Sequence, residues 1–171
     1  VVNNKWKLDD NMLPPMEKDV KGYYPSIYKI LKDQVPEIKT AFYYNWAKLI
    51  EPYNQAYIDE VSYERSDGYI ANYNKASNFI IENKDKPTFV FLYSVHTDHA
   101  GHKFGWMSPE YITAIEEADV YIGEFLDKLK AVDLYENTYF MFLTDHGGIG
   151  EKGHGGISTT EMEVPWSITG P

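Results

Sequence analysis

The sequence predicts an α/β protein built on a mostly parallel sheet with helices on both faces. Two observations carry this prediction. Continuous apolar runs such as "TFVFLYSV" and "TYFMFLT" are typical of strands buried on both faces. Helical patterns separate these runs, and the order strand, helix, strand is typical of a parallel sheet whose crossover connections are helices.

The first elements follow one another in that alternating order. Residues 1–24 form an irregular lead-in, because "LPP" and "GYYP" interrupt any periodic pattern. A helix is predicted over "PSIYKILKDQ", ending before Pro36, and a strand over "KTAFYYNW", where aromatic residues are frequent. A second helix is predicted from about residue 67 to residue 83, and the apolar run "TFVFLYSV" follows it.

The clearest helix begins at "SPEY". Ser108 has the side chain of an N-cap, Pro109 is at the first helical position, and Glu110 complements the helix dipole. Apolar residues then recur at helical spacing as far as Leu129. The strands "TYFMFLT" and "VPWSIT" come next. We therefore expect one α/β domain over residues 1–171, truncated because its last strand ends where another element should follow.

Composition narrows the classes of function. The 171 residues include 26 acidic and 16 basic side chains, a formal net charge of −10 without a Lys/Arg cluster, which argues against a nucleic-acid polymer as partner. An acidic protein that handles phosphate needs positive charge from another source, and a bound metal ion supplies it. The absence of cysteine excludes disulfides and thiolate ligands. No apolar run is long enough to cross a bilayer.

All five histidines lie in two stretches, "SVHTDHAGHKFGW" and "TDHGGIGEKGHGG", and both follow predicted strands. Sites in an open parallel sheet form where the strands end, so the two stretches can meet although they are far apart in the chain. Aspartate and neutral histidine are oxygen and nitrogen ligands that zinc accepts. The glycines between them let the backbone turn sharply beside a ligand. The alternative is that "DHGG" and "GHGG" are simple turns whose histidines bond to backbone.

Other residues near these stretches are weaker candidates. His96 and His99 alternate with the better candidates, and we expect them to point elsewhere. Lys103 and Lys152 could reach an anionic substrate, although an exposed lysine is usually only solvated. Glu161 in "TTEMEVPW" is a candidate to support a metal ligand without touching the metal.

The motifs "DHAGHKFGW", "TDHGGIGEKGHGG" and "TTEMEVPW" resemble those of the alkaline phosphatase superfamily, in particular its type I phosphodiesterase/nucleotide pyrophosphatase branch. The resemblance implies an alkaline-phosphatase-like fold and hydrolysis of small phosphate esters with two zinc ions. It implies that Asp98, His102 and His154 bind one zinc ion. The second ion would be bound by Asp145 and His146. In such enzymes two metal ions hold the phosphoryl group and activate a Ser or Thr nucleophile.

The first half of the chain resembles the family only loosely. The family has an Asp-Gly motif after its first strand and a Ser or Thr nucleophile further on, and we identify neither here. Asp67 in "SDG" follows no apolar strand, and Ser158 and Thr159 come after the metal ligands. We therefore expect the nucleophile to lie upstream of Val1. This chain alone would then be inactive and would hold one zinc ion or none.

Several further expectations and alternatives remain. Asn45 and Trp46 end the strand "KTAFYYN" and are candidate substrate contacts, with core packing as the alternative for Trp46. The resemblance implies a periplasmic, secreted or cell-surface location. Alternative functions are a sulfatase or a metal-dependent phosphomutase of the same superfamily, or a non-catalytic metal-binding or interaction domain. The histidine-rich motifs argue against the sulfatase, whose calcium site is usually rich in Asp and Asn.

Overall fold

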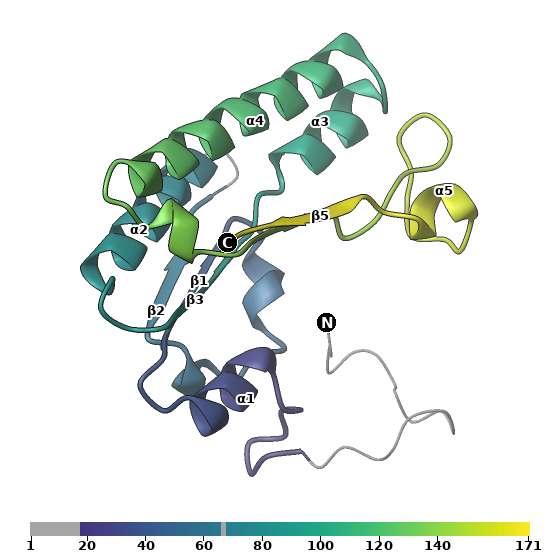
Figure 1. Ribbon diagram of the computed structural model, residues 1–171. Helices are drawn as coiled ribbons and strands as arrows, with labels where there is room; N and C mark the ends of the chain where they lie inside the picture. Colours follow the sequence, from purple (N-terminus) through teal and green to yellow (C-terminus); the bar gives the residue numbers. More distant parts are fainter. Residues whose placement is uncertain (1–17, 66–67) are drawn as a thin grey trace. The chain divides into compact units, whose positions relative to one another are not determined.

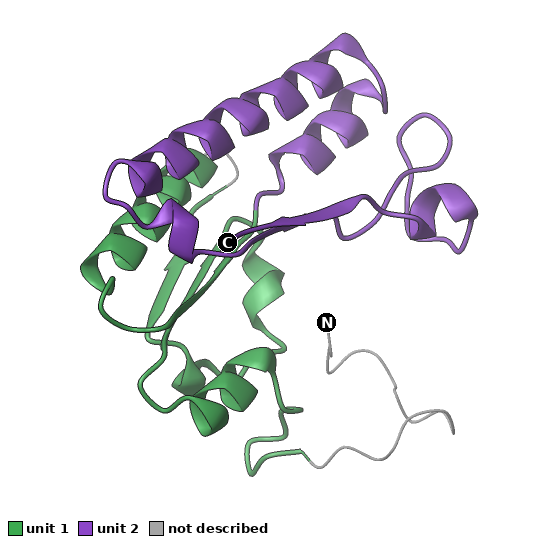
Figure 2. Cartoon of the chain, viewed as in Figure 1, with its two compact units in different colours: residues 1–93 green, residues 94–171 purple. Residues whose placement is uncertain are grey.

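The computed structural model describes residues 18–65 and 68–171 (Figure 1). The chain divides into two compact units, residues 1–93 and residues 94–171 (Figure 2). The single domain expected over residues 1–171 is not tested by this division and stays a prediction. Asp67 and residues 1–17 of the predicted lead-in lie outside the described residues.

The first unit contains a three-stranded parallel sheet with the strand order β2–β1–β3. Strand β1 (Lys39–Tyr44) lies between β2 (Glu60–Tyr63) and β3 (Thr88–Leu92). Strands β1 and β3 confirm two predicted strands, whereas the short polar β2 has no counterpart among the predicted elements. The expectation that "TFVFLYSV" is buried on both faces is wrong, because every residue of β3 is only half-buried.

Helices pack on both faces of this sheet, as predicted. Neighbouring residues of a strand point to opposite faces. On one face of β1, Phe42 packs against Tyr28 of α1 (Ile27–Gln34), with ring centroids 6.0 Å apart. On the other face, the Tyr43 hydroxyl lies 3.4 Å from a backbone carbonyl of α2 (Tyr69–Glu82). Two short 3-10 helices, η1 (Ala47–Ile50) and η2 (Gln55–Tyr57), complete the unit.

The core of the first unit is aromatic. Phe42 is fully buried, and its ring centroid lies 4.9 Å from that of Phe91 and 5.2 Å from that of Tyr44. Tyr28 is also buried, and its hydroxyl donates to the Ala41 carbonyl at 3.2 Å. Burial raises the pKa of Tyr28. Full burial of the Phe42 side chain contributes about 1.5–3 kcal/mol to the stability of this unit.

The second unit begins with two helices, α3 (His96–Phe104) and α4 (Pro109–Lys130). Helix α4 begins as predicted, because the Ser108 hydroxyl accepts a hydrogen bond from the Tyr111 amide at 3.2 Å. Helix α3 was not among the predicted elements. None of the described helices of the protein combines the length and the apolar character that crossing a membrane requires.

The second unit ends in a two-stranded antiparallel sheet of β4 (Phe140–Leu143) and β5 (Trp166–Thr169). A 3-10 helix, η4 (Tyr135–Asn137), precedes β4, and the short helix α5 (Thr159–Met162) precedes β5. Both strands were predicted at these places in the sequence. Their antiparallel pairing was not.

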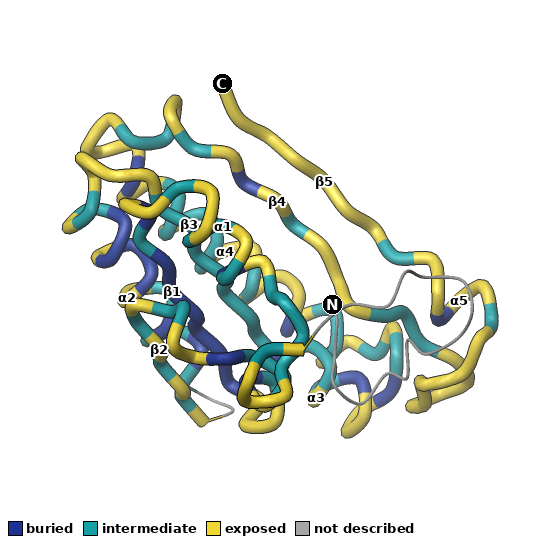
Figure 3. The backbone as a smooth tube through the Cα atoms, turned by 90° about the horizontal axis from the view of Figure 1, so that it is seen from below, coloured by how far each residue is buried: buried dark blue, intermediate teal, exposed yellow. Residues whose placement is uncertain are grey.

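The expectation that "TYFMFLT" is buried on both faces is wrong. Only one side of β4 is packed: Phe140 is 8% exposed, with its ring centroid 5.3 Å from that of Tyr135 and 6.4 Å from that of Phe125. On the opposite side, Met141 and Leu143 are 59% and 61% exposed (Figure 3). The apolar run therefore predicted the position of the strand correctly, but it did not predict how far each side of the strand is buried.

Candidate metal centre

All five predicted metal ligands lie in the second unit. Asp98 and His102 are on α3, Asp145 and His146 follow β4, and His154 is on the loop between β4 and α5. The structure brings Asp98, His102 and His154 together, because one ligand atom from each lies within 4.8 Å of the others. Two stretches that are far apart in the chain thus converge on one place.

The carboxylate of Asp98 is the centre of this group. Its Oδ1 atom lies 3.4 Å from the Nε2 atom of His102, 3.4 Å from that of His154 and 4.0 Å from that of His146. Oδ1 is buried and has no hydrogen-bond partner among the described residues. A buried carboxylate oxygen without a partner is unfavourable, and a cation at this position would satisfy it.

Backbone carbonyls orient two of the imidazole rings. His102 Nδ1 lies 2.7 Å from the Lys152 carbonyl, and His146 Nδ1 lies 2.8 Å from the Gly147 carbonyl. Because a carbonyl can only accept, each Nδ1 donates its proton and each neutral ring keeps a lone pair on Nε2. Metal-binding histidines are typically held in this way by their second nitrogen.

The Nε2 atoms of His102 and His154 face each other 2.9 Å apart. Since His102 keeps a lone pair on Nε2, this distance fits either a proton donated by His154 or a metal ion bound by both nitrogens. Together with the Asp98 carboxylate, the donor set therefore fits a metal ion.

Helical spacing explains which residues of α3 take part. Asp98 and His102 are four residues apart, so they lie on one face of the helix. His99 follows Asp98 directly and therefore lies on a different face. His96 donates from Nε2 to the Ala114 carbonyl of α4 at 2.9 Å, and burial lowers the pKa of its imidazole. His96 is thus engaged with α4.

Glu161 holds the turn that follows His154. It is 4% exposed, and its carboxylate accepts hydrogen bonds from the Gly156 amide at 2.7 Å and the Ser158 hydroxyl at 2.5 Å. These bonds, from the Ser158 side chain first and the Gly156 backbone second, lower the pKa of Glu161. Ser158 is the N-cap of α5, and Glu161 completes the capping box. Glu161 thus orders the turn after His154, and its role in supporting a metal ligand stays a prediction.

The turn after β4 needs a glycine at position 147. The Gly147 amide donates to the Glu161 carbonyl at 2.8 Å. A Cβ atom at this position would lie 2.0 Å from the Thr160 carbonyl oxygen, so no other residue fits without moving the backbone. The backbone of the "DHGG" turn therefore lies in direct contact with the backbone of α5.

Sequence reasoning missed Trp106, the last residue of "DHAGHKFGW". Its ring centroid lies 5.5 Å from that of His102 and 6.4 Å from that of His154. Its position at the end of the motif was the one signal that could have identified it.

Asn45 and Trp46 belong to the first unit. Asn45 is 3% exposed and follows β1 directly, while Trp46 is 46% exposed and precedes η1. The predicted metal ligands lie in the second unit, so the role of these two residues as substrate contacts stays a prediction.

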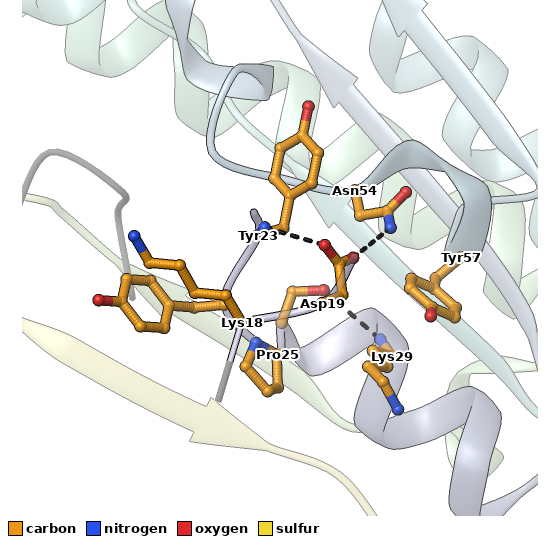
Figure 4. Close-up of a pocket in the computed structure, with 9 residues that line it drawn as sticks. Lys18, Asp19, Tyr23, Pro25, Lys29, Asn54 and Tyr57 are labelled. Atoms are coloured by element: carbon orange, nitrogen blue, oxygen red, sulfur yellow. Dashed lines mark hydrogen bonds between the residues drawn. The ribbon is translucent and has the colours of Figure 1, made fainter. Parts of the chain in front are cut away.

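The first unit also has a hollow of about 280 Å³ at its α1 end (Figure 4). Its charged groups already have partners. The Asp19 carboxylate accepts from the Tyr23 amide at 3.0 Å and from Asn54 Nδ2 at 2.6 Å, and Lys29 forms an ion pair with Asp33. These contacts are consistent with a structural role, and they contrast with the unsatisfied carboxylate in the second unit.

The chain is similar to several known proteins in sequence and in fold. The family model described as type I phosphodiesterase / nucleotide pyrophosphatase matches residues 3–162. An uncharacterised pyrophosphatase/phosphodiesterase of Schizosaccharomyces pombe is 39% identical over 67 residues, which cover 39% of this chain and 14% of that protein. The venom phosphodiesterase of Macrovipera lebetinus is 27% identical over 135 residues, which cover 78% of this chain and 12% of that protein.

Human ectonucleotide pyrophosphatase/phosphodiesterase family member 1 is 24% identical over 135 residues, covering 78% of this chain and 11% of that protein. Among solved structures, the lipoteichoic acid synthase LtaP from Listeria monocytogenes is similar with a TM-score of 0.63 and 17% identity. The likeness covers 86% of this chain and 46% of that one. At this identity it shows the fold alone, and it confirms the predicted fold class. The chain spans only a small part of the curated relatives it matches.

Proposed function

The chain belongs to the type I phosphodiesterase/nucleotide pyrophosphatase family, and from this premise we propose that the whole protein is a metal-dependent hydrolase of phosphate esters. The observation that carries the proposal is the convergence of Asp98, His102 and His154, whose ligand atoms lie within 4.8 Å of one another. Relatives named as phosphodiesterases and pyrophosphatases support small phosphodiester or nucleotide substrates. The names of a venom enzyme and an ectoenzyme support a secreted or cell-surface location.

The donor set favours zinc as the metal. Two imidazole nitrogens and one carboxylate oxygen are a ligand set typical of catalytic zinc, which keeps its fourth position open for water or substrate. Calcium prefers six to eight oxygen ligands, so the two imidazoles also argue against the sulfatase alternative. When bound, zinc would supply the positive charge that this acidic chain lacks and would polarise a phosphoryl oxygen.

We also propose a second zinc position, beside Asp145 and His146. The His146 Nε2 atom lies 3.7 Å from Asp145 Oδ1 and 4.0 Å from Asp98 Oδ1, so the two proposed positions would be neighbours. Two side chains of this chain are assigned to the second ion and three to the first. The second ion should therefore bind more weakly.

The residues gathered here bind and orient, and none of them is assigned as the nucleophile. The Ser158 hydroxyl donates to Glu161 and caps α5, which supports a structural role for it. A Ser or Thr nucleophile is expected of this reaction, and no residue of the centre is assigned to that role. We therefore propose that these 171 residues bind zinc without hydrolysing phosphodiesters by themselves.

The first test is a zinc titration of the purified, metal-free chain. Bound zinc is measured by mass spectrometry, and affinity by competition with a chromogenic chelator. We expect one tightly bound ion in the wild type and its loss in His102→Ala. The matched control is His99→Ala, which removes an imidazole from another face of the same helix and should leave binding unchanged. Equal zinc binding by wild type and His102→Ala would contradict the proposed centre.

A second test addresses the nucleophile separately. The zinc-loaded chain is incubated with bis(p-nitrophenyl) phosphate, and we expect no release of nitrophenol above that of zinc alone. Hydrolysis that depends on His102 would show that these residues suffice for the reaction, with a side chain or a zinc-bound water as the nucleophile. That result would overturn the proposed inactivity and leave the metal centre intact.

A further inference from the structure

The loop that carries His154 is tied to the region of His102 through three consecutive carbonyl groups. The Trp106 amide donates to the Glu151 carbonyl at 2.8 Å. The next carbonyl, of Lys152, accepts from His102 Nδ1 at 2.7 Å. The third, of Gly153, accepts from Trp106 Nε1 at 3.0 Å. Two of these three bonds come from Trp106, through its backbone and through its indole.

The Trp106 ring also occupies space that two glycines leave open. A Cβ atom at Gly101, on α3, would lie 1.7 Å from the ring. A Cβ atom at Gly148, in the turn after β4, would lie 2.9 Å from it. Gly101 precedes His102 directly, and Gly148 is two residues after His146. One indole thus contacts the backbone of all three segments that carry proposed ligands.

The indole is itself held in place. The Tyr111 ring, in the first turn of α4, packs edge-on against it with centroids 5.5 Å apart. A separate bond ties the same loop to α3, because Lys152 Nζ donates to the Lys103 carbonyl at 2.7 Å. Loss of the indole bond should therefore loosen the loop without detaching it, and variants of Trp106 should still fold.

We propose that Trp106 is a positioning residue that brings the three ligand-bearing segments together before a metal ion binds. The inference rests on the proposed function, since it takes Asp98, His102 and His154 as ligands. Its physical reason is conformational entropy. A loop that is already ordered loses little freedom when the metal binds, whereas a mobile loop must be ordered at the expense of affinity.

The test compares two Trp→Phe substitutions in the same unit. Trp106→Phe removes the Nε1 donor and part of the ring, while the backbone amide remains. We expect its zinc dissociation constant to rise about tenfold, the lower end of the range for residues that orient metal ligands. The matched control, Trp166→Phe, changes a residue of β5 that is 67% exposed, and it should bind zinc like the wild type.

Hydrogen exchange of the metal-free chain provides a readout that does not depend on zinc. The amides of Ile149 and Gly153 bond to each other's carbonyls at 2.9 and 3.1 Å, and they should exchange several-fold faster in Trp106→Phe. Unchanged exchange within α4 shows that the variant is folded. Gly148→Ala is a second variant, which crowds the ring without removing it and should shift both readouts in the same direction.

The outcomes separate the two proposals. If the wild type binds zinc and Trp106→Phe matches it in affinity and in exchange, the positioning role is wrong and the metal centre stands. If the wild type binds no zinc, the proposed function is wrong, and the positioning role for a metal centre is lost with it. Faster exchange together with weaker zinc binding in Trp106→Phe and Gly148→Ala supports the inference.

Discussion

The two units of the molecule hold their central residues by different forces. In the first unit, Phe42 and Tyr43 of β1 have no exposed surface, and the Phe42 ring packs against other aromatic rings. Figure 3 shows the buried backbone of β1 in dark blue. In the second unit, the proposed ligands keep contact with solvent: the side chains of Asp98, His102 and His154 are 25%, 43% and 27% exposed. Hydrogen bonds to loop carbonyls and close backbone contacts at glycines hold them there.

This difference reflects two kinds of interaction. Burial is non-directional, so it produces a compact aromatic cluster without aiming any polar group. Hydrogen bonds are directional, so they can aim imidazole nitrogens at a carboxylate, although each one contributes little net stability. We therefore expect the first unit to respond most to cavity-forming substitutions and the second to respond most to metal.

The largest expected effect is in the first unit. Phe42→Ala removes a fully buried ring and should lower the free energy of unfolding by about 3–5 kcal/mol. Urea unfolding followed by circular dichroism measures this change. The control Val20→Ala alters a fully exposed side chain and should stay within about 0.5 kcal/mol of the wild type. A Phe42→Ala variant as stable as the wild type would contradict the burial account.

The next effect should be confined to the second unit. Zinc at a hundred times its dissociation constant should stabilise this unit by about 2.7 kcal/mol, because the ion binds only the folded form. Hydrogen exchange with zinc and then with excess chelator measures the effect, which should appear in α3 and the following loops. Equal protection of β1 and α3 by zinc would mean that the two units do not respond separately.

A smaller effect is expected where the second unit uses a carboxylate to shape a turn. Glu161→Gln removes the negative charge and one of the oxygens that hold Gly156 and Ser158. Zinc affinity should fall by about tenfold or less, because the turn after His154 becomes less ordered. Competition with a chelator measures it. Glu163→Gln, an exposed carboxylate two residues away, is the matched control and should have no effect.

The smallest effect concerns an ion pair of the first unit. Burial raises the pKa of Asp59, but hydrogen bonds from Lys32 and from the Thr40 amide outweigh it, so the pKa lies below the ordinary value of 3.8. The stabilisation is therefore present above about pH 4 and is lost as pH falls through the lowered pKa.

Asp59→Asn should accordingly cost about 1 kcal/mol or less at pH 7, since the pair is partly exposed, and should be nearly neutral once Asp59 is protonated. Urea unfolding at pH 7 and at about pH 2, well below the ordinary pKa of 3.8, measures both values. Asp33→Asn, in a more exposed ion pair, is the control. A cost that is the same at both pH values would show that the charge of Asp59 does not contribute.

Helices and strands whose apolar residues form a regular pattern could be predicted from the sequence, and the other elements could not. Helices α1, α2 and α4 and strands β1, β3 and β4 appear where apolar residues recur at helical spacing or in runs, and β5 lies in the candidate strand "VPWSIT". Helix α3 has no such pattern, because the face that carries Asp98 and His102 is polar. Strand β2 is too short and too polar to stand out. The antiparallel pairing of β4 with β5 depends on hydrogen bonds between distant segments, which no local pattern encodes.

The candidate site shows the same division. Its residue types were visible because aspartates and histidines of two motifs follow predicted strands. Trp106 was not recognised, because its role depends on the space beside Gly101 and Gly148, two positions far apart in the chain. Glu161 was recognised as a candidate, yet its bonds to Gly156 and Ser158 were not foreseeable from its place in the motif.

The sequence by itself determined the family, the parallel sheet of the first unit, and the presence of nitrogen and oxygen groups of the kind that zinc accepts. Only the tertiary structure decided the orientation of these side chains relative to one another. It directs His102 Nδ1 to the Lys152 carbonyl and leaves Nε2 facing Asp98 and His154. The physical reason is that the direction of a hydrogen bond depends on both partners, and here the partners come from segments that meet only when the chain folds.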